Sequence, residues 1–470
     1  MAIGHCKDVE NGEIVINGLE DLEEPFIQKE GKVVSYQDED DDQENNGGSV
    51  GMVLLSTFVA VCASFEFGSC VGYSAPTQSA VRDDLHLSLA EFSTFGSILT
   101  IGAMLGAITS GRIADIVGRK GAMRISACFC ITGWLAVYFS NGSLLLDIGR
   151  FFTGYGIGVF SYVVPIFIAE IAPRNLRGLL TTLNQLLIVT GSSVAYIIGS
   201  IIPWRILALT GLVPCVLLLV GLCFVPESPR WLAKVGLDKE FQVALRKLRG
   251  KDADITREAA EIQVYILTLR SLPKASIRDL FKSKYIRSVI IGVSLMVLQQ
   301  FVGINGIGFY TSETFVQAGL SSGKLGTILY ACVQVPITVV GAFLMDKSGR
   351  RPLIMGQNMF LDWVPVLAVG GILIYIAFFS IGFGAVPWVI MSEIFPINIK
   401  GVAGSLVVLV NWSGAWAVSY TFNFLMSWSS SGTFFIYSAF SVITVLFVAK
   451  FVPETKGKTL EQIQASINKS

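Results

Sequence analysis

The sequence predicts an all-α membrane protein made of two similar halves. The 470 residues are 52% hydrophobic and 15% charged, with a mean hydropathy of +0.62, which is far more apolar than a soluble domain. Long apolar runs recur along the chain, and several polar motifs occur twice in the same order. The runs are too long for barrel strands, and helices satisfy their own backbone hydrogen bonds in lipid. We therefore expect a polytopic bundle of helices.

Eleven apolar runs approach the roughly 20 residues that a helix needs to cross a hydrocarbon core of about 30 Å. In chain order they cover residues 52–74, 92–110, 122–140, 144–168, 179–202, 205–225, 287–310, 325–345, 364–390, 402–425 and 433–452.

The first 50 residues predict a disordered acidic tail. Residues 1–47 contain fourteen Asp or Glu and three Lys, and they show little apolar periodicity. The loops that follow the second, fourth and sixth runs hold most of the Lys and Arg between runs, which marks them as cytosolic. The acidic tail is accordingly expected in the cytosol, and the C-terminal tail, 453–470, is expected there as well.

Residues 226–286 form a long polar insert between the two halves, 51–225 and 287–452. Its apolar residues, such as Phe241, Leu245 and Leu248, follow helical spacing with charges between them. This pattern predicts short amphipathic helices at the inner face of the membrane.

Three motif pairs indicate an internal duplication. "GRIADIVGRK" (111–120) corresponds to "DKSGRRP" (346–352), "EIAPRNLRG" (170–178) to "EIFPINIKG" (393–401), and "PESPRWL" (226–232) to "PETKG" (453–457). Parallel repeats of this kind imply six helices in each half and a site between the halves.

The repeated charges predict a gating network at the cytosolic ends of the helices. Arg binds carboxylates through two parallel hydrogen bonds, so such pairs would hold the halves together in one conformation and release them in another. The alternative is that these are ordinary loop charges near the lipid surface. The network comprises Asp115, Arg119, Arg150, Glu170, Arg177, Asp346, Arg350 and Glu393.

The composition argues against an enzyme and against a metal or cofactor site. Only two histidines are present, His5 and His86, and no pair of nucleophile and base is apparent. Seven of the eight cysteines fall in apolar runs without a CxxC pair, so we interpret them as packing residues. Catalytic residues, metal ligands, cofactors and nucleic-acid partners are not expected.

The motifs together resemble those of the sugar porter family of the major facilitator superfamily, over about residues 50–460. "GRIADIVGRK", "RFFTGYGIG", "PESPRWL", "QQFVGING", "DKSGRRP", "VPWVIMSEIFP" and "PETKG" occur in that family's order. The acidic tail and "MSEIFPINIKG" resemble the plant early-responsive-to-dehydration-like monosaccharide transporters in particular. The resemblance implies hexose transport by alternating access at the tonoplast (the vacuolar membrane) or the plasma membrane.

A sugar site needs amides for the hydroxyl groups and an aromatic ring for the apolar face. Gln299, Gln300 and Asn305 supply amides within an otherwise apolar run, and Gly303, Gly306 and Gly308 are expected to bend the helix there. The family resemblance adds further substrate-binding residues. These are Gln185, Gln334, Trp388 and Asn411. For Gln334 an interhelical hydrogen bond is an equal alternative, and Trp412 fits a packing role as well as a sugar contact.

The question of proton coupling depends on "FEFGSCVGY", 65–73. Proton-coupled family members resemble "FGYD" here, whereas this chain has Cys70 at the acidic position, which leaves Arg150 without that partner. We therefore favour facilitated diffusion. Glu66 lies one helical turn before Cys70 and keeps proton symport open as the alternative, since a buried carboxyl group can carry a proton. Asp147, three residues before Arg150, is a second nearby acid.

The stretch after "GRRP" is too short for the ninth of the family's twelve helices. Only Pro352 to Leu361 precede Asp362, and ten helical residues extend about 15 Å. We expect eleven spans, with the ninth helix missing. An odd number would place "SEIFPINIKG" and Lys456 outside, against the charge bias. The alternative is two short spans within 352–391.

Two other function classes share part of this pattern. A sugar sensor without transport activity would carry the same motifs, and a shortened form of the transporter would be inactive. A transporter of organic ions would need charged groups in its cavity, where this chain offers amides.

Overall fold

The computed structural model describes residues 50–173, 176–250, 253–271, 277–318, 320–348, 368–384, 386–395, 399–454 and 467. The predicted acidic tail lies outside this part of the chain except for Val50. Within it, the regular structure is helical, as the fold class predicted.

The first half contains six predicted runs, and each forms a helix or a pair of helices. A capping box between Ser88 and Glu91 begins the second long helix, and Gly118, with φ +80°, separates the second from the third. The helices are α1 (Gly51–Gly72), α2 (Ser74–Asp84), α3 (Leu89–Ile116), α4 (Gly118–Tyr138), α5 (Ser143–Ile171), α6 (Arg177–Gly199), α7 (Trp204–Thr210) and α8 (Leu212–Phe224).

The insert forms the short helices that its pattern predicted: α9 (Pro229–Val235), α10 (Asp238–Arg249), α11 (Thr256–Ser271) and the 3-10 helix η2 (Ile277–Phe281). Phe241, Leu245 and Leu248 are buried. Arg249 joins the insert to the bundle, since its Nη1 donates to the carbonyl oxygen of Ile171 at the end of α5 (2.9 Å).

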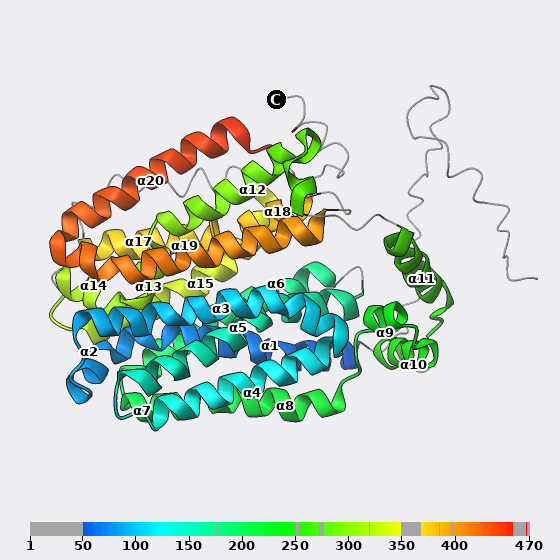
Figure 1. The fold of residues 1–470 in the computed structure, drawn as a ribbon, viewed down its shortest axis with the longest axis horizontal. Coiled ribbons are helices and arrows are strands. Elements are labelled where there is room, and N and C mark those ends of the chain that lie inside the picture. Colours follow the sequence, from blue (N-terminus) through cyan, green and yellow to red (C-terminus); the bar gives the residue numbers. More distant parts are fainter. Residues whose placement is uncertain are drawn as a thin grey trace, which may run out of the picture. The chain divides into compact units, whose positions relative to one another are not determined.

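The second half is less regular than the first. Its helices are α12 (Ser283–Phe301), α13 (Ile304–Phe309), α14 (Thr311–Gln317), α15 (Gly323–Ser348), α17 (Ala368–Ile381), α18 (Val386–Ile394), α19 (Lys400–Trp428) and α20 (Ser430–Phe451). In Figure 1, α1 to α8 form the lower layer and α12 and α17 to α20 the upper one. Helices α3 and α19, and α6 and α15, pack across the boundary between the halves.

Ten described helices are long and apolar enough to cross a membrane, and they match ten of the eleven predicted runs. The exception is 364–390, whose prediction as one continuous span is wrong. Its described part divides after Ile381 into α17 and α18, which have 14 and 9 residues. Gly382 and Gly384 fall at this division, where glycine weakens a helix.

The direction of α17 and α18 changes the expected topology. The hydroxyl of Tyr375 donates to the carbonyl oxygen of Val302, and the amide of Gln299 donates to that of Phe383. Further along, Phe395 packs beside Gly292. Later residues of α17 and α18 thus meet earlier residues of α12, so α17 and α18 run antiparallel to α12. Helix α15 also begins at the end of α12, because Gly323 lies against Ser312. Helices α15 and α17–α18 therefore run in the same direction.

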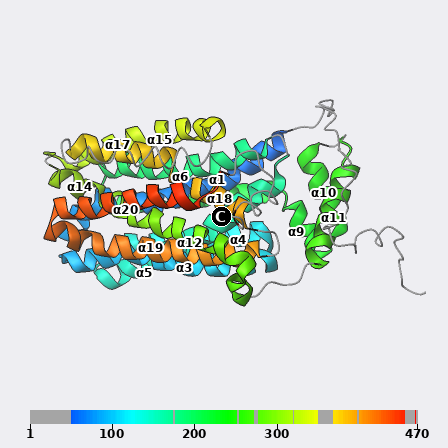
Figure 2. The same ribbon diagram turned by 90° about the horizontal axis from the view of Figure 1, so that it is seen from above.

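The C-terminal tail consequently returns to the end of the bundle that carries the insert. Arg287, near the start of α12, donates to the carbonyl oxygen of Ile467 (3.2 Å), and Val452 packs with Tyr285 and Ile394. The described residues Ile394, Val452 and Ile467 therefore lie at the end of the bundle that carries the insert, and the cytosolic placement of "SEIFPINIKG" and the tail stays a prediction. Figure 2 shows α9, α10 and α11 grouped beside one end of the long helices. Residues 349–367, where the ninth helix is expected to be missing, lie outside the described part.

Candidate functional site

A break between α12 and α13 places the predicted amides. Gly303 has φ +94°, a left-handed conformation that side chains rarely adopt, and it interrupts the helix between Gln300 and Asn305. A Cβ at this position would also collide with the ring of Tyr437. The sequence prediction that glycine bends this helix is confirmed at Gly303.

Three amides form one hydrogen-bonded chain at the break. The Nε2 of Gln300 donates to Oδ1 of Asn411 on α19 (2.7 Å), and Nδ2 of Asn305 donates to Oε1 of Gln300. Gln299 faces α17–α18, where its Nε2 donates to the carbonyl oxygen of Phe383 (2.5 Å). Gln300 and Asn411 are 4% and 7% exposed. The structure thus brings together three of the predicted residues, Gln300, Asn305 and Asn411, and gives Gln299 a backbone partner.

The other predicted binding residues lie on different helices. Gln185 is half-buried on α6, and its amide makes no hydrogen bond within the described residues. Gln334 is half-buried on α15, and its Oε1 is buried without a described partner. Trp388 is 38% exposed on α18 and makes no described ring contact. None of these three residues takes part in the described hydrogen bonds of the amide chain.

An aromatic pair beside the amides spans the two halves. Trp412, next to Asn411, packs against Phe67 of α1 with ring centroids 6.1 Å apart. On the opposite side, the hydroxyl of Tyr196 on α6 donates to the carbonyl oxygen of Gly308 (2.8 Å), and its ring contacts Tyr330 at 5.2 Å. Sequence reasoning missed both tyrosines, because an aromatic residue in an apolar run resembles any other packing residue.

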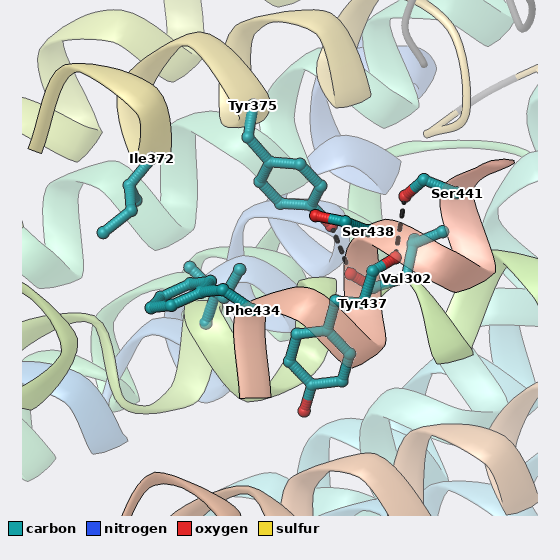
Figure 3. Close-up of a pocket in the computed structure, with 8 residues that line it drawn as sticks. Val302, Ile372, Tyr375, Phe434, Tyr437, Ser438 and Ser441 are labelled. Carbon is teal, nitrogen blue, oxygen red and sulfur yellow. Dashed lines mark hydrogen bonds between the residues drawn. The ribbon is translucent and has the colours of Figure 1, made fainter. Parts of the chain in front are cut away.

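A small cavity of about 20 Å³ lies beside the break within the second half (Figure 3). Figure 3 shows Tyr375, Phe434 and Ile372 at its edge, and the described lining is almost entirely apolar. Tyr375 donates to the carbonyl of Val302 (3.1 Å), so it offers little further polar contact. The amide chain does not line this cavity. A sugar needs several hydrogen-bonding partners, and the amide chain fits that requirement better.

Arg150 is fully buried without a carboxylate partner among the described residues. Its Nη1 donates to the carbonyl of Cys70 (2.8 Å) and its Nη2 to Oγ of Ser74 (2.6 Å), and the guanidinium lies 5.0 Å from the centre of the Phe95 ring. The expectation that Cys70 leaves Arg150 without its acidic partner is thus confirmed in the described part. Asp147, on the same helix, does not pair with it.

Glu66 is fully buried one turn below Cys70, as the helical spacing predicted. Its Oε1 accepts hydrogen bonds from Nε1 of Trp134 (2.5 Å) and from Sγ of Cys70 (3.2 Å). Its Oε2 is buried without a described hydrogen-bond donor. A carboxyl group in this position is a reasonable proton carrier, but it does not contact Arg150 directly.

The end of the first half that carries the insert contains part of the predicted charge network. Nε and Nη2 of Arg119 each donate to Glu170 at 2.8 Å, and Nη1 lies 3.5 Å from Oδ1 of Asp115. Asp115 also accepts from Nζ of Lys234 on α9 (2.8 Å). Within the described residues these contacts join α3, α4, α5 and the insert. The interpretation that they clamp one half to the other is not what these contacts show, because Arg119 and Glu170 belong to the same half.

Glu227 is a member of this network that sequence reasoning quoted in a motif but did not select. Its carboxylate accepts from the backbone N–H groups of Arg119 (3.2 Å), Lys120 (3.0 Å) and Ser228 (2.8 Å). Burial raises the pKa of Glu227, and these backbone donors oppose the rise. Only the tertiary structure places this carboxylate beside Gly118 at the start of α4, and the sequence signal was its position in the motif "PESPRWL".

The counterpart charges of the second half are only partly described. The side chain of Asp346 and all of Arg350 lie outside the described part. Glu393 lies in the last turn of α18 and Arg177 is the first residue of α6, and the side chain or backbone of each interacts with another group. Their proposed pairing remains a prediction.

Comparisons with known proteins show which proteins this chain is similar to. The family described as "Sugar (and other) transporter" matches residues 54–466. The sugar transporter ERD6-like 16 of Arabidopsis thaliana is 71% identical, with both chains fully covered, and ERD6-like 7 of the same plant is 63% identical over 89% of this chain and 94% of the relative.

The fold agrees with solved sugar transporters. An inward-open structure of the xylose transporter XylE from E. coli has a TM-score of 0.75 and 28% identity, covering 88% of this chain and 99% of XylE. A structure of the proton:xylose symporter XylE bound to 6-bromo-6-deoxy-D-glucose has a TM-score of 0.73 and 28% identity, covering 88% of this chain and 98% of XylE.

The alignment to ERD6-like 16 also bears on the missing helix. It extends over 489 positions, which is 19 more than the 470 residues of this chain. At least that many positions of the relative therefore have no counterpart here, a length close to one membrane span.

Proposed function

Because the chain belongs to the sugar transporter family, among its ERD6-like members, we propose that it carries a monosaccharide, a hexose, across a membrane by alternating access. The observation that carries this proposal is the amide chain of Gln300, Asn305 and Asn411 at the Gly303 break. It places hydrogen-bond donors and acceptors between α12, α13 and α19, beside the Trp412–Phe67 pair that joins the halves. Gln185, Gln334 and Trp388 would complete the contacts to sugar in other conformations of the transport cycle.

Two substitutions test the site directly. Gln300→Ala or Asn411→Ala removes one amide from the hydrogen-bonded set and leaves its partner unpaired, which costs about 1–3 kcal/mol of binding free energy. The hexose concentration at half-saturation should therefore rise by roughly 5- to 150-fold. The measurement is uptake of labelled hexose into proteoliposomes that contain equal amounts of each protein.

Asn184→Ala is the matched control. Asn184 is an amide of the same size on α6, and its Oδ1 accepts from Ser64 within the first half (2.7 Å). Because Asn184 does not belong to the amide chain, its loss is expected to leave the half-saturation concentration within about twofold of the wild-type value. Unchanged half-saturation in both Gln300→Ala and Asn411→Ala would contradict the site.

We propose facilitated diffusion as the transport mode. Its support is the absence of a carboxylate next to Arg150 in the described part and the thiol at position 70. The alternative is proton symport through Glu66, which its burial and the symporter among the compared structures favour. Hexose accumulation driven by an imposed pH gradient, and lost in Glu66→Gln, would establish the alternative. Uptake that is insensitive to the gradient would support facilitated diffusion.

The membrane in which the protein works is proposed to be the tonoplast, with the plasma membrane as the alternative. Localisation of a fluorescent fusion in plant cells against markers of both membranes distinguishes them. A non-transporting sensor would bind hexose in the same assays without saturable flux, which separates that class from a transporter.

A further inference from the structure

The first half contains a buried cluster of sulfur and carboxylate groups that the proposed sugar site does not use. Glu66 on α1, Cys130 on α4 and Cys215 on α8 come from three different helices. Their ligand atoms all lie within 4.8 Å of one another, and all three residues are buried. A fourth group, the Sγ of Cys70, lies 3.2 Å from Oε1 of Glu66. Residues distant in sequence thus converge on one point.

We propose that Glu66, Cys130 and Cys215, with Cys70 as a fourth ligand, form a binding site for a thiophilic divalent cation of the zinc type. Zinc prefers four ligands drawn from Cys sulfur, His nitrogen and carboxylate oxygen in tetrahedral geometry. With metal–sulfur distances of about 2.3 Å, the ligands of such a site lie about 3.8 Å apart. The ligand atoms of Glu66, Cys130 and Cys215, all within 4.8 Å of one another, are close to that spacing.

The free oxygen of Glu66 is the second observation that points to a cation. Its Oε1 is held by Trp134 and Cys70, whereas Oε2 is buried and accepts no hydrogen bond from any described residue. An unpartnered buried oxygen is costly, and a cation satisfies it. Trp134 then acts as the outer partner that orients the ligating carboxylate, as such partners do in known metal sites.

The charge of the site balances without further ions. Two thiolates from Cys130 and Cys215 neutralise a divalent cation, Cys70 coordinates as a neutral thiol, and the carboxylate of Glu66 is then matched by Arg150. That guanidinium is buried, has no described carboxylate partner, and donates to the backbone carbonyl of Cys70. A neutral set of groups is the requirement for burial in an apolar interior. The cation would join α1 to α4 and α8 and stiffen the first half.

The test uses the full chain, produced in zinc-supplemented medium, purified in detergent under reducing conditions and washed free of loose metal. We expect about one zinc ion per chain by elemental analysis, and a higher thermal unfolding temperature when zinc is present, because a ligand that binds the folded state stabilises it. Cadmium in place of zinc should give a sulfur-to-metal charge-transfer absorption, which reports thiolate ligation independently of transport.

Cys130→Ser combined with Cys215→Ser should abolish the zinc content, the thermal shift and the cadmium absorption. Glu66→Gln keeps a hydrogen-bond acceptor for Trp134 and should weaken binding at least about 100-fold, since loss of outer partners alone costs 10- to 100-fold. It therefore tests the site even if the double variant fails to fold. A control variant that replaces the other four described cysteines should retain all three signals. Its changes are Cys62→Ser, Cys128→Ser, Cys223→Ser and Cys332→Ser.

Three outcomes would overturn the proposal. They are a metal-free wild-type protein that also fails to bind cadmium, zinc retained in the Cys130/Cys215 or Glu66 variants, and zinc lost in the control variant. Because each readout is independent of hexose flux, failure of this site and failure of the proposed transport activity remain distinguishable.

Discussion

The two halves of the bundle pack their helices in different ways. In the first half, α3 and α5 touch backbone to backbone: a Cβ at Gly154 would collide with the carbonyl of Leu99, and one at Gly158 with the carbonyl of Ala103. In the second half, the corresponding close approach at Gly306 is to the ring of Phe422. Side chains can rotate away, whereas backbone cannot. The first half is therefore built as a rigid unit, and the second half as one that can adjust around its broken helices.

Their polar groups differ in the same sense. The first half holds an ion-pair network at the end that carries the insert, centred on Arg119 and Glu170, and a buried cation, Arg150. The described interior of the second half is held by neutral amides and tyrosine hydroxyls, such as Gln300 and Tyr375. Neutral amides exchange hydrogen bonds with a sugar at little electrostatic cost. The comparison suggests that substrate recognition depends mainly on the second half.

The largest expected effect, on abundance and hexose flux, comes from restoring the ninth helix that the second half is predicted to lack. Insertion of about 20 to 25 apolar residues after Met355 restores the length of one span. We expect abundance and hexose flux to rise well above those of the chain as it stands, because the added helix covers surfaces that α15, α17 and α20 otherwise leave to lipid. Flux into proteoliposomes and accessibility of a C-terminal tag from each side of the membrane measure this.

A matched insertion of polar, flexible residues of equal length is the control for the restored helix. Equal flux and equal tag orientation in the original and restored chains would show that residues 349–367 already complete the second half. The interpretation of a missing helix would then have to be abandoned.

The second expected effect tests the rigid packing of the first half. Gly158→Ala forces α3 and α5 apart and should lower the free energy of unfolding by about 3 kcal/mol, the upper end of the cost of overpacking. Gly306→Ala in the second half should cost only about 1 kcal/mol, because the Phe422 ring can turn. In detergent, the unfolding temperature of Gly158→Ala should therefore be lower than that of Gly306→Ala, and both should be lower than that of the wild type.

Gly404→Ala supplies the control for both glycine variants. No atom lies within 4 Å of a Cβ at this position on α19, so the change should stabilise the helix by about 0.5–1 kcal/mol. Equal effects of Gly158→Ala and Gly306→Ala would remove the proposed difference between the halves.

The third expected effect concerns the ion pair of the first half. The side chains of Arg119 and Glu170 are 10% and 13% exposed, and two hydrogen bonds join them. A double-mutant cycle with Arg119→Ala and Glu170→Ala should give a coupling energy of about 2 kcal/mol, as for a buried charged hydrogen bond. The same cycle on Lys234 and Asp115, which are about half exposed, should give less than about 1 kcal/mol. Similar values for the two cycles would contradict this ranking.

The smallest expected effect is the pH dependence from Glu227. Burial raises its pKa in the folded protein, so the folded state binds the proton more tightly than the unfolded chain does. The stability that the protonated group contributes is present below its unfolded pKa of about 4.3 and is lost as the pH rises through the folded value. Relative to Glu227→Gln, the wild type should therefore lose stability with rising pH. A difference in unfolding temperature that is constant with pH would contradict this assignment.

Much of the fold and part of the site could be predicted from sequence. Hydropathy located ten of the spans, because each helix must bury its own backbone in lipid and leaves a run of the same length. Amides in an apolar run are costly unless used, so Gln300 and Asn305 were identifiable without a structure. Tyr196 and Cys215 were not identifiable as contact residues, since aromatic residues and cysteines also occur in apolar runs simply for packing.

The sequence by itself determined that this chain is a helical membrane protein with duplicated halves and an amide-rich seventh run. Those properties depend on local composition and on motifs that are contiguous in the chain. Only the tertiary structure decided that Asn411 pairs with Gln300, that α17 and α18 run antiparallel to α12, and that Glu66, Cys130 and Cys215 meet. These are contacts between residues 64 to 149 positions apart, or a direction set by packing, and neither is visible in the local sequence pattern of either partner.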